Sequence, residues 1–196
     1  GNPPFIGAST MRRALGEGYV DVLRSTWKEL PESADFVMYW WHIAAEAVRA
    51  NAAQQFGFIT TNSIKQTFNR RIIEAQLTAK NPLSLTFAIP DHPWVDSADG
   101  AAVRIAMTVA TVGDVSGNLT LVQKEWPINQ DQIEVELFKA TGKIHADLKI
   151  GANVPSAKPL KSNLSSSNRG YQLFGAGFLV DPEQLETIDF HKNENL

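Results

Sequence analysis

The chain has 196 residues, of which 43% are hydrophobic and 20% charged, and its formal net charge is −3. This composition is typical of a folded protein rather than a disordered one, and the length suits one large domain or two small ones. The sequence contains no cysteine, which excludes disulfides and thiolate metal sites. Nucleic-acid-binding domains are usually basic, so the charge counts mildly against a free-standing DNA-binding protein.

The amino terminus has an unusual composition. The chain begins with an Asn-Pro-Pro-Phe motif at residues 2–5, at the place where a start methionine is expected. Ile6 and Gly7 follow the motif. We interpret residue 1 as a point inside a larger domain, so that this chain is its second part. The sequence has no signal-peptide pattern and no apolar run near the roughly 20 residues of a membrane span. We therefore expect a cytoplasmic protein without membrane contact.

The region up to residue 77 predicts helices around one strand. After the loop at residues 2–10, short helical pieces are expected over 9–28. A longer helix is predicted from Asp35 to about residue 52, because its apolar residues fall on one broad face. Residues 55–61 are apolar nearly throughout, which is typical of a strand in a parallel sheet covered on both faces. Ser63 and Gln66 have the spacing of a capping box for a helix over 64–77.

Strands dominate the rest of the chain. A strand is expected over 83–89, then a rigid turn at residues 90–94 with two prolines, and a second strand over 102–112. These two strands have no helix between them and should pair antiparallel. Three shorter strands are predicted over 117–126, 132–139 and 144–150, with Gly142 favouring a hairpin between the last two. The polar segment 151–170 is expected to cover a surface, and Asp181 to cap a final short helix.

This order defines an α/β fold, the second half of an open sheet followed by a small β-rich region. We place the first domain at residues 1–113, and a β-rich connector with the start of a further domain at residues 114–196.

The element order, together with the first motif, resembles class I methyltransferases that use S-adenosylmethionine. The similarity is closest to the N6-adenine DNA methyltransferases of bacterial restriction-modification systems that are fused to a target-recognition domain. It covers nearly the whole chain. The motif alone is only moderately specific, because RNA and protein-glutamine methyltransferases carry it too. The matching segments are residues 2–7, 34–37 with Trp40, 58–64, 94–104, 146–152 and 175–178.

The resemblance implies a role for each motif residue. The Asn2 side chain and the Pro3 carbonyl would accept the two amino hydrogens of adenine and increase the nucleophilicity of its nitrogen. Phe5 would stack on the adenine, which must leave the duplex to be reached, and Trp94 would form a second aromatic wall. We therefore expect Asn2, Pro3 and Phe5 to be catalytic, Phe5 and Trp94 to bind the flipped base, and Asn2 also to contact the cofactor. No metal is implied.

In the family, a glycine-rich loop and an acidic residue ahead of the catalytic motif form most of the S-adenosylmethionine site. Neither occurs in this sequence. We therefore expect the cofactor site to be incomplete and the isolated chain to bind the cofactor weakly or not at all. The expected partners are DNA, the missing amino-terminal part of the same protein, and a second copy, because an open sheet edge tends to self-associate.

Two other functions stay open at this point. One is methyl transfer to RNA or to a protein glutamine, and the other is a non-catalytic homologue that binds DNA or a partner. The long β-rich extension from residue 114 favours DNA, while Asn2 and Phe5 favour an active enzyme. Several other residues have simpler structural interpretations: a core position for Trp40 and Trp41, a strand end and cap for Asn62 and Ser63, and a solvated helix face for Arg70 and Arg71.

Overall fold

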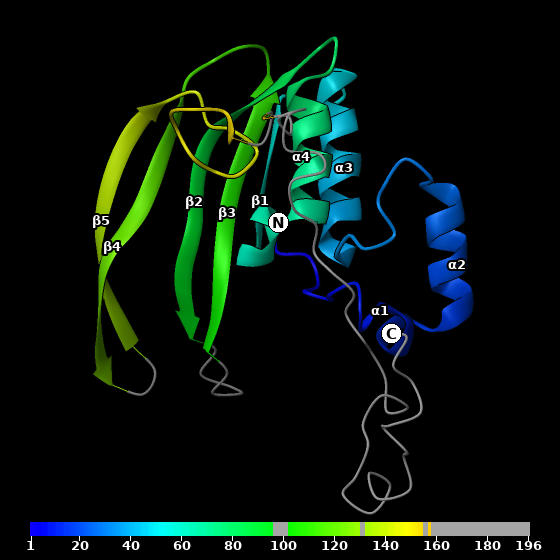
Figure 1. Cartoon of the computed structure of the whole chain (residues 1–196), viewed down its shortest axis with the longest axis horizontal. Helices are drawn as coiled ribbons and strands as arrows, with labels where there is room; N and C mark the ends of the chain where they lie inside the picture. Colours follow the sequence, from blue (N-terminus) through cyan, green and yellow to red (C-terminus); the bar gives the residue numbers. More distant parts are fainter. Residues whose placement is uncertain (96–101, 130–131, 155–156, 158–196) are drawn as a thin grey trace, which may run out of the picture. The chain divides into compact units, whose positions relative to one another are not determined.

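The computed structural model describes residues 1–95, 102–129, 132–154 and 157. They belong to one compact unit, Gly1–Ala157. The end of the predicted polar segment 151–170 and the final short helix expected after Asp181 lie outside the described residues. Within the unit, helices precede and interrupt a single sheet of five strands (Figure 1).

The helical start matches the expectation of short pieces followed by one long helix. Gly16 separates the first two helices with a φ of 87°, a conformation that residues with a side chain rarely adopt. The third helix buries eight of its residues because apolar side chains recur every three or four positions. The helices are α1 (Met11–Leu15), α2 (Glu17–Thr26) and α3 (Phe36–Arg49).

The next segment corrects one local prediction. Strand β1 covers Gln55–Thr61 as expected. The capping box is wrong, because Ser63 lies in a 3-10 turn, η1 (Asn62–Lys65), and helix α4 begins only at Thr67 and ends at Leu77. The Ser63 hydroxyl donates to the Asp35 carboxylate instead of capping α4. Phe68 of α4 is 45% exposed and lies against the Arg71 guanidinium.

The strands form a mixed sheet in the order β1-β3-β2-β4-β5. Strands β2 (Leu83–Val95) and β3 (Ala102–Val112) pair antiparallel, as the sequence predicted. The parallel environment expected for β1 was only partly right, because β1 pairs antiparallel with β3. Strand β4 (Gly117–Asn129) adds to β2 in the parallel sense. Strands β1, β2 and β4 therefore all point the same way.

The segment at residues 90–94 is not a turn. Strand β2 continues through both prolines to Val95, and its ladder with β3 shifts register between Ile89 and His92. Such a bulge accommodates prolines, which cannot donate a backbone hydrogen bond. Trp94 consequently lies near the end of a long strand.

The β-rich extension continues the same sheet. Strands β4 and β5 (Gln132–Gly142) form a long antiparallel hairpin, so the hairpin predicted at Gly142 is wrong. The third predicted strand, over 144–150, is a turn closed by an isolated bridge between Ile144 and Ile150. The domain boundary at residues 113 and 114 stays a prediction.

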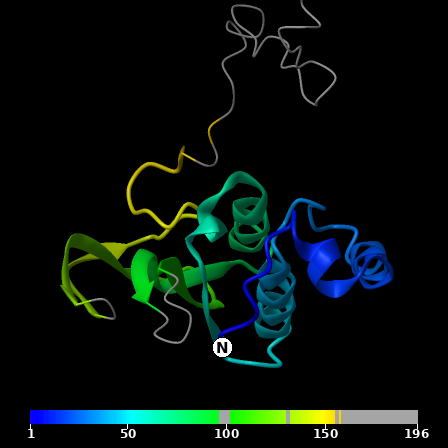
Figure 2. The same cartoon turned by 90° about the horizontal axis from the view of Figure 1, so that it is seen from below.

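Helices α3 and α4 lie side by side against the sheet (Figures 1 and 2). At their contact with the sheet, the fully buried Trp41 of α3 packs edge-on against Phe56 of β1, with ring centroids 5.0 Å apart. Its indole N–H donates to the Thr108 hydroxyl of β3 at 3.3 Å. Trp41 thus connects the long helix to two neighbouring strands, and the predicted core position is confirmed. Trp40, predicted to be in the core as well, is 46% exposed.

The pair Trp40 and Trp41 offers a matched test of this core. Replacing Trp41 with Ala should lower the free energy of unfolding by about 3–5 kcal/mol, because it opens a cavity and leaves Thr108 without its donor. Replacing the exposed Trp40 with Ala should cost about 1 kcal/mol or less. Urea denaturation of the chain followed by circular dichroism measures both. Equal losses for the two variants would contradict the packing described.

Candidate active site

The Asn-Pro-Pro-Phe motif leaves the sheet at the edge where strands β1, β2 and β4 end. The Gly1 amino group donates to the Gly57 carbonyl at 2.6 Å, and Ile59 donates to the Gly1 carbonyl at 2.9 Å. Bonds to the residues on either side of Phe58 are the pattern of a parallel strand pair. The motif therefore continues toward the carboxyl end of β1. Ligands of open α/β sheets bind outside the carboxyl ends of the strands.

The motif side chains are accessible. Asn2 and Phe5 are exposed, Phe5 by 40%, and Pro3 is half-buried. No described residue donates to or accepts from the Asn2 side chain, so its amide is available to a ligand. An exposed amide, a carbonyl at a proline and an exposed aromatic ring are thus presented together by four consecutive residues.

Beyond the motif, the loop is fastened to helix α3. Phe36 donates its backbone N–H to the Ile6 carbonyl at 2.9 Å, and Ala8 donates to the Asp35 carboxylate at 3.0 Å. A cavity of about 230 Å³ lies between this loop and the end of β1. Its lining is formed by Phe5, Ile6, Gly7, Asp35, Val37, Thr61, Ser63 and Gln66.

Sequence reasoning missed the part that Asp35 plays here. Asp35 was read as the start of a helix, and Ser63 as a cap. In the structure both belong to one polar cluster with Asn69 of α4, which is 4% exposed. A polar amide on the inner face of an amphipathic helix was the signal that pointed to such a cluster, since a buried polar group needs a partner.

Trp94 stands at the same edge of the sheet and is 41% exposed, but it is not among the residues that line the 230 Å³ cavity. Close to it along β2, Asp91 accepts from Arg104 at 2.5 Å and from Asn62 at 3.2 Å. Arg104 also holds Glu125 of β4 with two hydrogen bonds, at 2.7 and 3.1 Å. This charged bridge, Asp91, Arg104 and Glu125, connects strands β2, β3 and β4 near their ends at this edge.

The charged bridge shifts the pKa of each member. Burial raises the pKa of Asp91, but hydrogen bonds from Arg104 and Asn62 and the charge of Lys65 outweigh burial and bring this pKa below its usual value. The hydrogen bond from Arg104 likewise lowers the pKa of Glu125. Bonds to Glu125 and Asp91 raise the pKa of Arg104, which stays charged.

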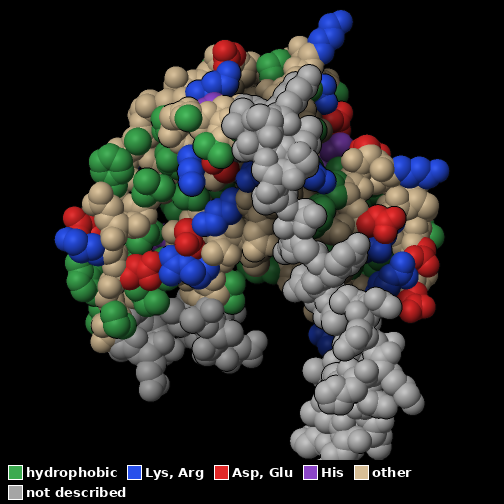
Figure 3. Space-filling view, viewed as in Figure 1, with side chains coloured by type: hydrophobic (Ala, Val, Ile, Leu, Met, Phe, Trp, Pro, Cys, Tyr) green, Lys and Arg blue, Asp and Glu red, His purple; other side chains and the backbone are tan. Residues whose placement is uncertain are grey.

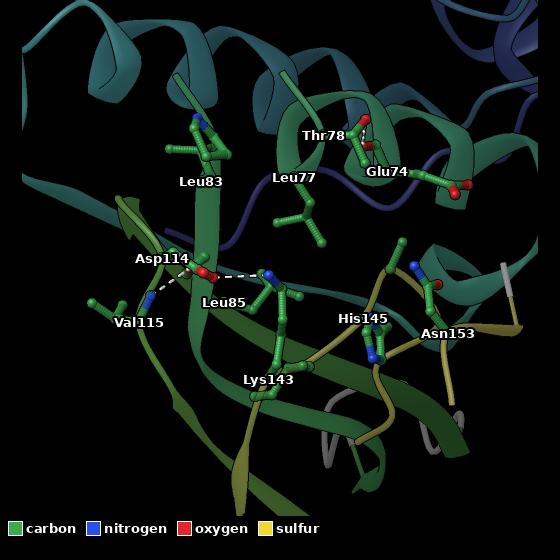
Figure 4. Close-up of a pocket in the computed structure, with 14 residues that line it drawn as sticks. Glu74, Leu77, Thr78, Leu83, Leu85, Asp114, Val115, Lys143, His145 and Asn153 are labelled. Atoms are coloured by element: carbon green, nitrogen blue, oxygen red, sulfur yellow. Dashed lines mark hydrogen bonds and ion pairs between the residues drawn. The ribbon is translucent and has the colours of Figure 1, made fainter. Parts of the chain in front are cut away.

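A second cavity has a volume of about 260 Å³ (Figure 4). It opens at the amino end of β2, between Leu83 and Leu85 on one side and the last turn of α4 at Leu77 on the other. The Lys143 ammonium meets the Asp114 carboxylate at its rim, 2.8 Å away. Its position at the opposite end of β2 separates it from the candidate active site.

The surface carries charges of both signs. On the face shown in Figure 3, basic and acidic side chains are interspersed, and hydrophobic side chains gather over β4 and β5. Exposed members of this hairpin include Trp126, Ile128, Leu137 and Phe138. Within the described ranges, no three His, Asp or Glu residues are grouped so as to hold a metal ion, and no helix is long and apolar enough to span a membrane.

Comparison with known proteins defines the class. Residues 1–122 match the model of the MmeI DNA-methyltransferase domain. A solved structure of the Type IIL restriction-modification enzyme MmeI in complex with DNA superimposes with a TM-score of 0.58 at 24% identity. The match covers 79% of this chain and 20% of that one, so the chain spans about a fifth of its structural relative. No curated protein matches the sequence.

The family model and the fold are those of a methyltransferase domain. The chain belongs to the MmeI DNA-methyltransferase domain family, because that family's model covers well over half of its residues. The predicted resemblance to restriction-modification DNA methyltransferases is confirmed at the level of the domain family. The predicted α/β class is also confirmed, as a mixed α/β fold with a five-stranded mixed sheet similar to that of MmeI.

Charge removal from the charged bridge should weaken the fold in a pH-dependent way. Because the pKa values of Asp91 and Glu125 are lowered in the folded state, the two carboxylates stabilise the fold above about pH 4. This stabilisation is lost as the pH falls through their folded-state pKa values. Arg104→Met should therefore cost about 1 kcal/mol at neutral pH, the range for exposed pairs. In urea titrations, the difference in free energy of unfolding between Arg104→Met and wild type should shrink as the pH is lowered from 5 to 3.

Lys143→Met is the matched control, because it removes a cation from the more exposed pair with Asp114. Its cost at neutral pH should be smaller than that of Arg104→Met. A gap for Arg104→Met that stays constant from pH 5 to pH 3 would show that the charges of Asp91 and Glu125 do not stabilise the fold.

Proposed function

We propose that this chain is the base-binding part of a restriction-modification DNA methyltransferase that transfers a methyl group from S-adenosylmethionine to N6 of a flipped adenine. The observation that carries the proposal is the exposed Asn-Pro-Pro-Phe loop at the carboxyl edge of the sheet, in a domain of the MmeI family. The DNA-bound state of the MmeI structure favours DNA as the partner. The sheet would be the second half of a Rossmann-like class I methyltransferase sheet.

The motif has the acceptors that the reaction requires. The lone pair of adenine N6 is delocalised into the ring, which makes this nitrogen a weak nucleophile. Hydrogen bonds from both N6 hydrogens, one to the Asn2 side-chain oxygen and one to the Pro3 carbonyl, would localise that pair on the nitrogen. The fixed φ of proline holds the Pro3 backbone rigid. The N–C bond would form as the bond between the methyl carbon and the sulfonium sulfur breaks, and N6 would release one proton to water.

Aromatic walls would hold the flipped base. Phe5 follows the two acceptors directly and is 40% exposed, and Trp94 is exposed at the same edge. Base stacking on an aromatic ring contributes roughly 1–3 kcal/mol, which offsets part of the cost of leaving the duplex. The charged bridge next to Trp94 would keep the end of β2 in place.

The described residues fit the base better than they fit the cofactor. An amide, a carbonyl and an aromatic ring suit adenine, whereas only Asn2 is proposed to contact S-adenosylmethionine. The cofactor supplies an electrophilic methyl group on a sulfonium, and no metal is needed for such a transfer. The rest of its site, on this account, belongs to the amino-terminal part of the same protein.

The organisation of the longer protein follows the same proposal. Residues 1–113 would close the methyltransferase domain, and residues 114–196 would connect it to a target-recognition domain. The outer edge of β1 meets Gly1 and would pair with the preceding segment of that protein. In the isolated chain, this edge would instead favour self-association.

Removing the Asn2 amide should abolish most of the activity. In the complete methyltransferase that contains this chain, Asn2→Ala should lower kcat by about 10²–10³, the usual cost of one transition-state hydrogen bond. Asn2→Asp keeps an acceptor oxygen and should retain more activity than Asn2→Ala. Transfer of a radiolabelled methyl group, followed by nucleoside analysis of the DNA, measures both and identifies the methylated base.

The same assay separates the competing substrates. DNA, RNA and a protein mixture are offered in parallel, and the wild-type enzyme should label DNA at adenine N6. Label confined to RNA or protein, or equal activity of Asn2→Ala and wild type, would contradict the proposal.

Loss of the aromatic walls should act mainly on binding of the flipped base. Phe5→Leu and Trp94→Leu should each weaken the flipped state by roughly 1–3 kcal/mol. With 2-aminopurine at the target adenine, fluorescence titrations of the complete enzyme measure the effect. Trp126→Leu, on the exposed part of β4, is the control and should behave as wild type. Unchanged flipping in both variants would remove the stacking role.

A further inference from the structure

Asp35 stands at the junction of the catalytic loop, helix α3 and helix α4. Its Oδ1 accepts the backbone N–H of Ala8 at 3.0 Å. Its Oδ2 accepts the Ser63 hydroxyl at 2.6 Å and the Asn69 amide at 2.7 Å. Asn69 returns a bond, because its Oδ1 accepts the Asp35 backbone N–H at 2.9 Å. The carboxylate thus collects donors from three separate segments.

The function of this carboxylate is not helix capping. Asp35 occupies the N-cap position of α3, where an aspartate usually accepts a backbone N–H from the first turn. Here its side chain makes no such bond. Both oxygens are directed instead to the loop and to the segment from η1 to α4. Serine or asparagine could cap the N-terminus of α3 equally well. Accepting the three donors, however, requires an acceptor oxygen at both the Oδ1 and the Oδ2 position.

The cluster is partly buried, with Asn69 buried and both Asp35 and Ser63 half-buried, and its donors are matched to acceptors. Asn69 is 4% exposed, and its amide nitrogen donates to the Ser63 carbonyl at 3.0 Å as well as to Asp35. The Ser63 hydroxyl is also hydrogen-bonded to the Thr61 hydroxyl at 2.6 Å. Within the described ranges Asp35 makes no ion pair, so neutral donors alone satisfy its charge. Such hydrogen bonds to a charged group are stronger than neutral ones.

We propose that Asp35 is a positioning residue that holds the Asn-Pro-Pro-Phe loop in its working geometry, with Asn69 and Ser63 fixing the direction of its carboxylate. The inference rests on the proposed function. Ala8 is three residues after Phe5, and the neighbouring bond between Phe36 and Ile6 is made at the same helix end. Two hydrogen bonds at this helix end thus hold the loop behind Phe5, and loss of the Ala8 bond should loosen that attachment.

Asp35→Asn tests this directly, because it places an amide nitrogen where an acceptor is required. The remaining side-chain oxygen should keep the two donors Ser63 and Asn69, so the amide nitrogen faces the Ala8 N–H and leaves it without an acceptor. In the chain described here, amide exchange at Ala8 measured by NMR should become about 10- to 100-fold faster, the range for a lost hydrogen bond to a charge. Exchange of β3 amides such as that of Ala110 should stay unchanged and shows that the variant is folded.

The double variant Asp35→Asn with Asn69→Asp exchanges donor and acceptor between the partners. It keeps the charge and offers an acceptor to the backbone N–H of residue 35, so exchange at Ala8 should return to within a few-fold of wild type. Ser63→Ala removes one donor and should have a smaller effect than Asp35→Asn. Exchange at Ala8 that is unchanged in Asp35→Asn, or not restored in the double variant, overturns the proposal.

Activity of the complete methyltransferase provides the second measurement. Asp35→Asn should lower kcat by about 10- to 100-fold and leave KM for DNA within about twofold, because loop misplacement affects the reacting geometry more than overall DNA binding. The double variant should recover kcat. Faster exchange at Ala8 with an unchanged kcat would show that the hold of Asp35 on the loop does not affect the rate of methyl transfer, which overturns this part of the proposal. Absence of DNA methylation by the wild-type enzyme contradicts the proposed function instead, and exchange at Ala8 still decides whether Asp35 holds the loop.

Discussion

The two backbone hydrogen bonds between Gly1 and strand β1 set the direction in which the Asn-Pro-Pro-Phe motif leaves the sheet. Because they flank Phe58 in the parallel pattern, the motif runs toward the carboxyl end of β1 rather than away from it. Strands β2 and β4 end at the same edge, and they bring Trp94 and the charged bridge there. The arrangement of the candidate site thus follows from strand direction, with side-chain contacts refining it.

The candidate site combines exposed side chains with a partly buried support. Asn2 and Phe5 are accessible, whereas Asp35, Asn69 and Ser63 behind them are tied together by short hydrogen bonds. This division is chemically reasonable, because acceptors for an amino group must meet the substrate while the loop that presents them must stay in place. Trp41 joins α3, whose N-cap residue is Asp35, to β1 and β3.

Much of the fold could be predicted from the sequence, where hydrophobic patterns are strong. Strand β1 and strand β3 have the predicted bounds, and α3 differs only at its end. Local rules failed where tertiary contacts decided the outcome. Ser63 matched a capping box but serves Asp35 across the fold, and the prolines of β2 were accommodated by a bulge. The motif was evident from its residues, but its support was not, since Asn69 on the inner face of its helix indicates a polar partner without indicating which residue that is.

A DNA-bound structure of the complete methyltransferase would test the central claim most directly. The quantity to measure is the distance from N6 of the target adenine to the Asn2 side-chain oxygen and the Pro3 carbonyl. The account predicts a flipped adenine with both distances near 3 Å, the ordinary range of a hydrogen bond, and with its ring against Phe5. An adenine bound elsewhere, with the loop at residues 2–5 turned away from it, would contradict the account.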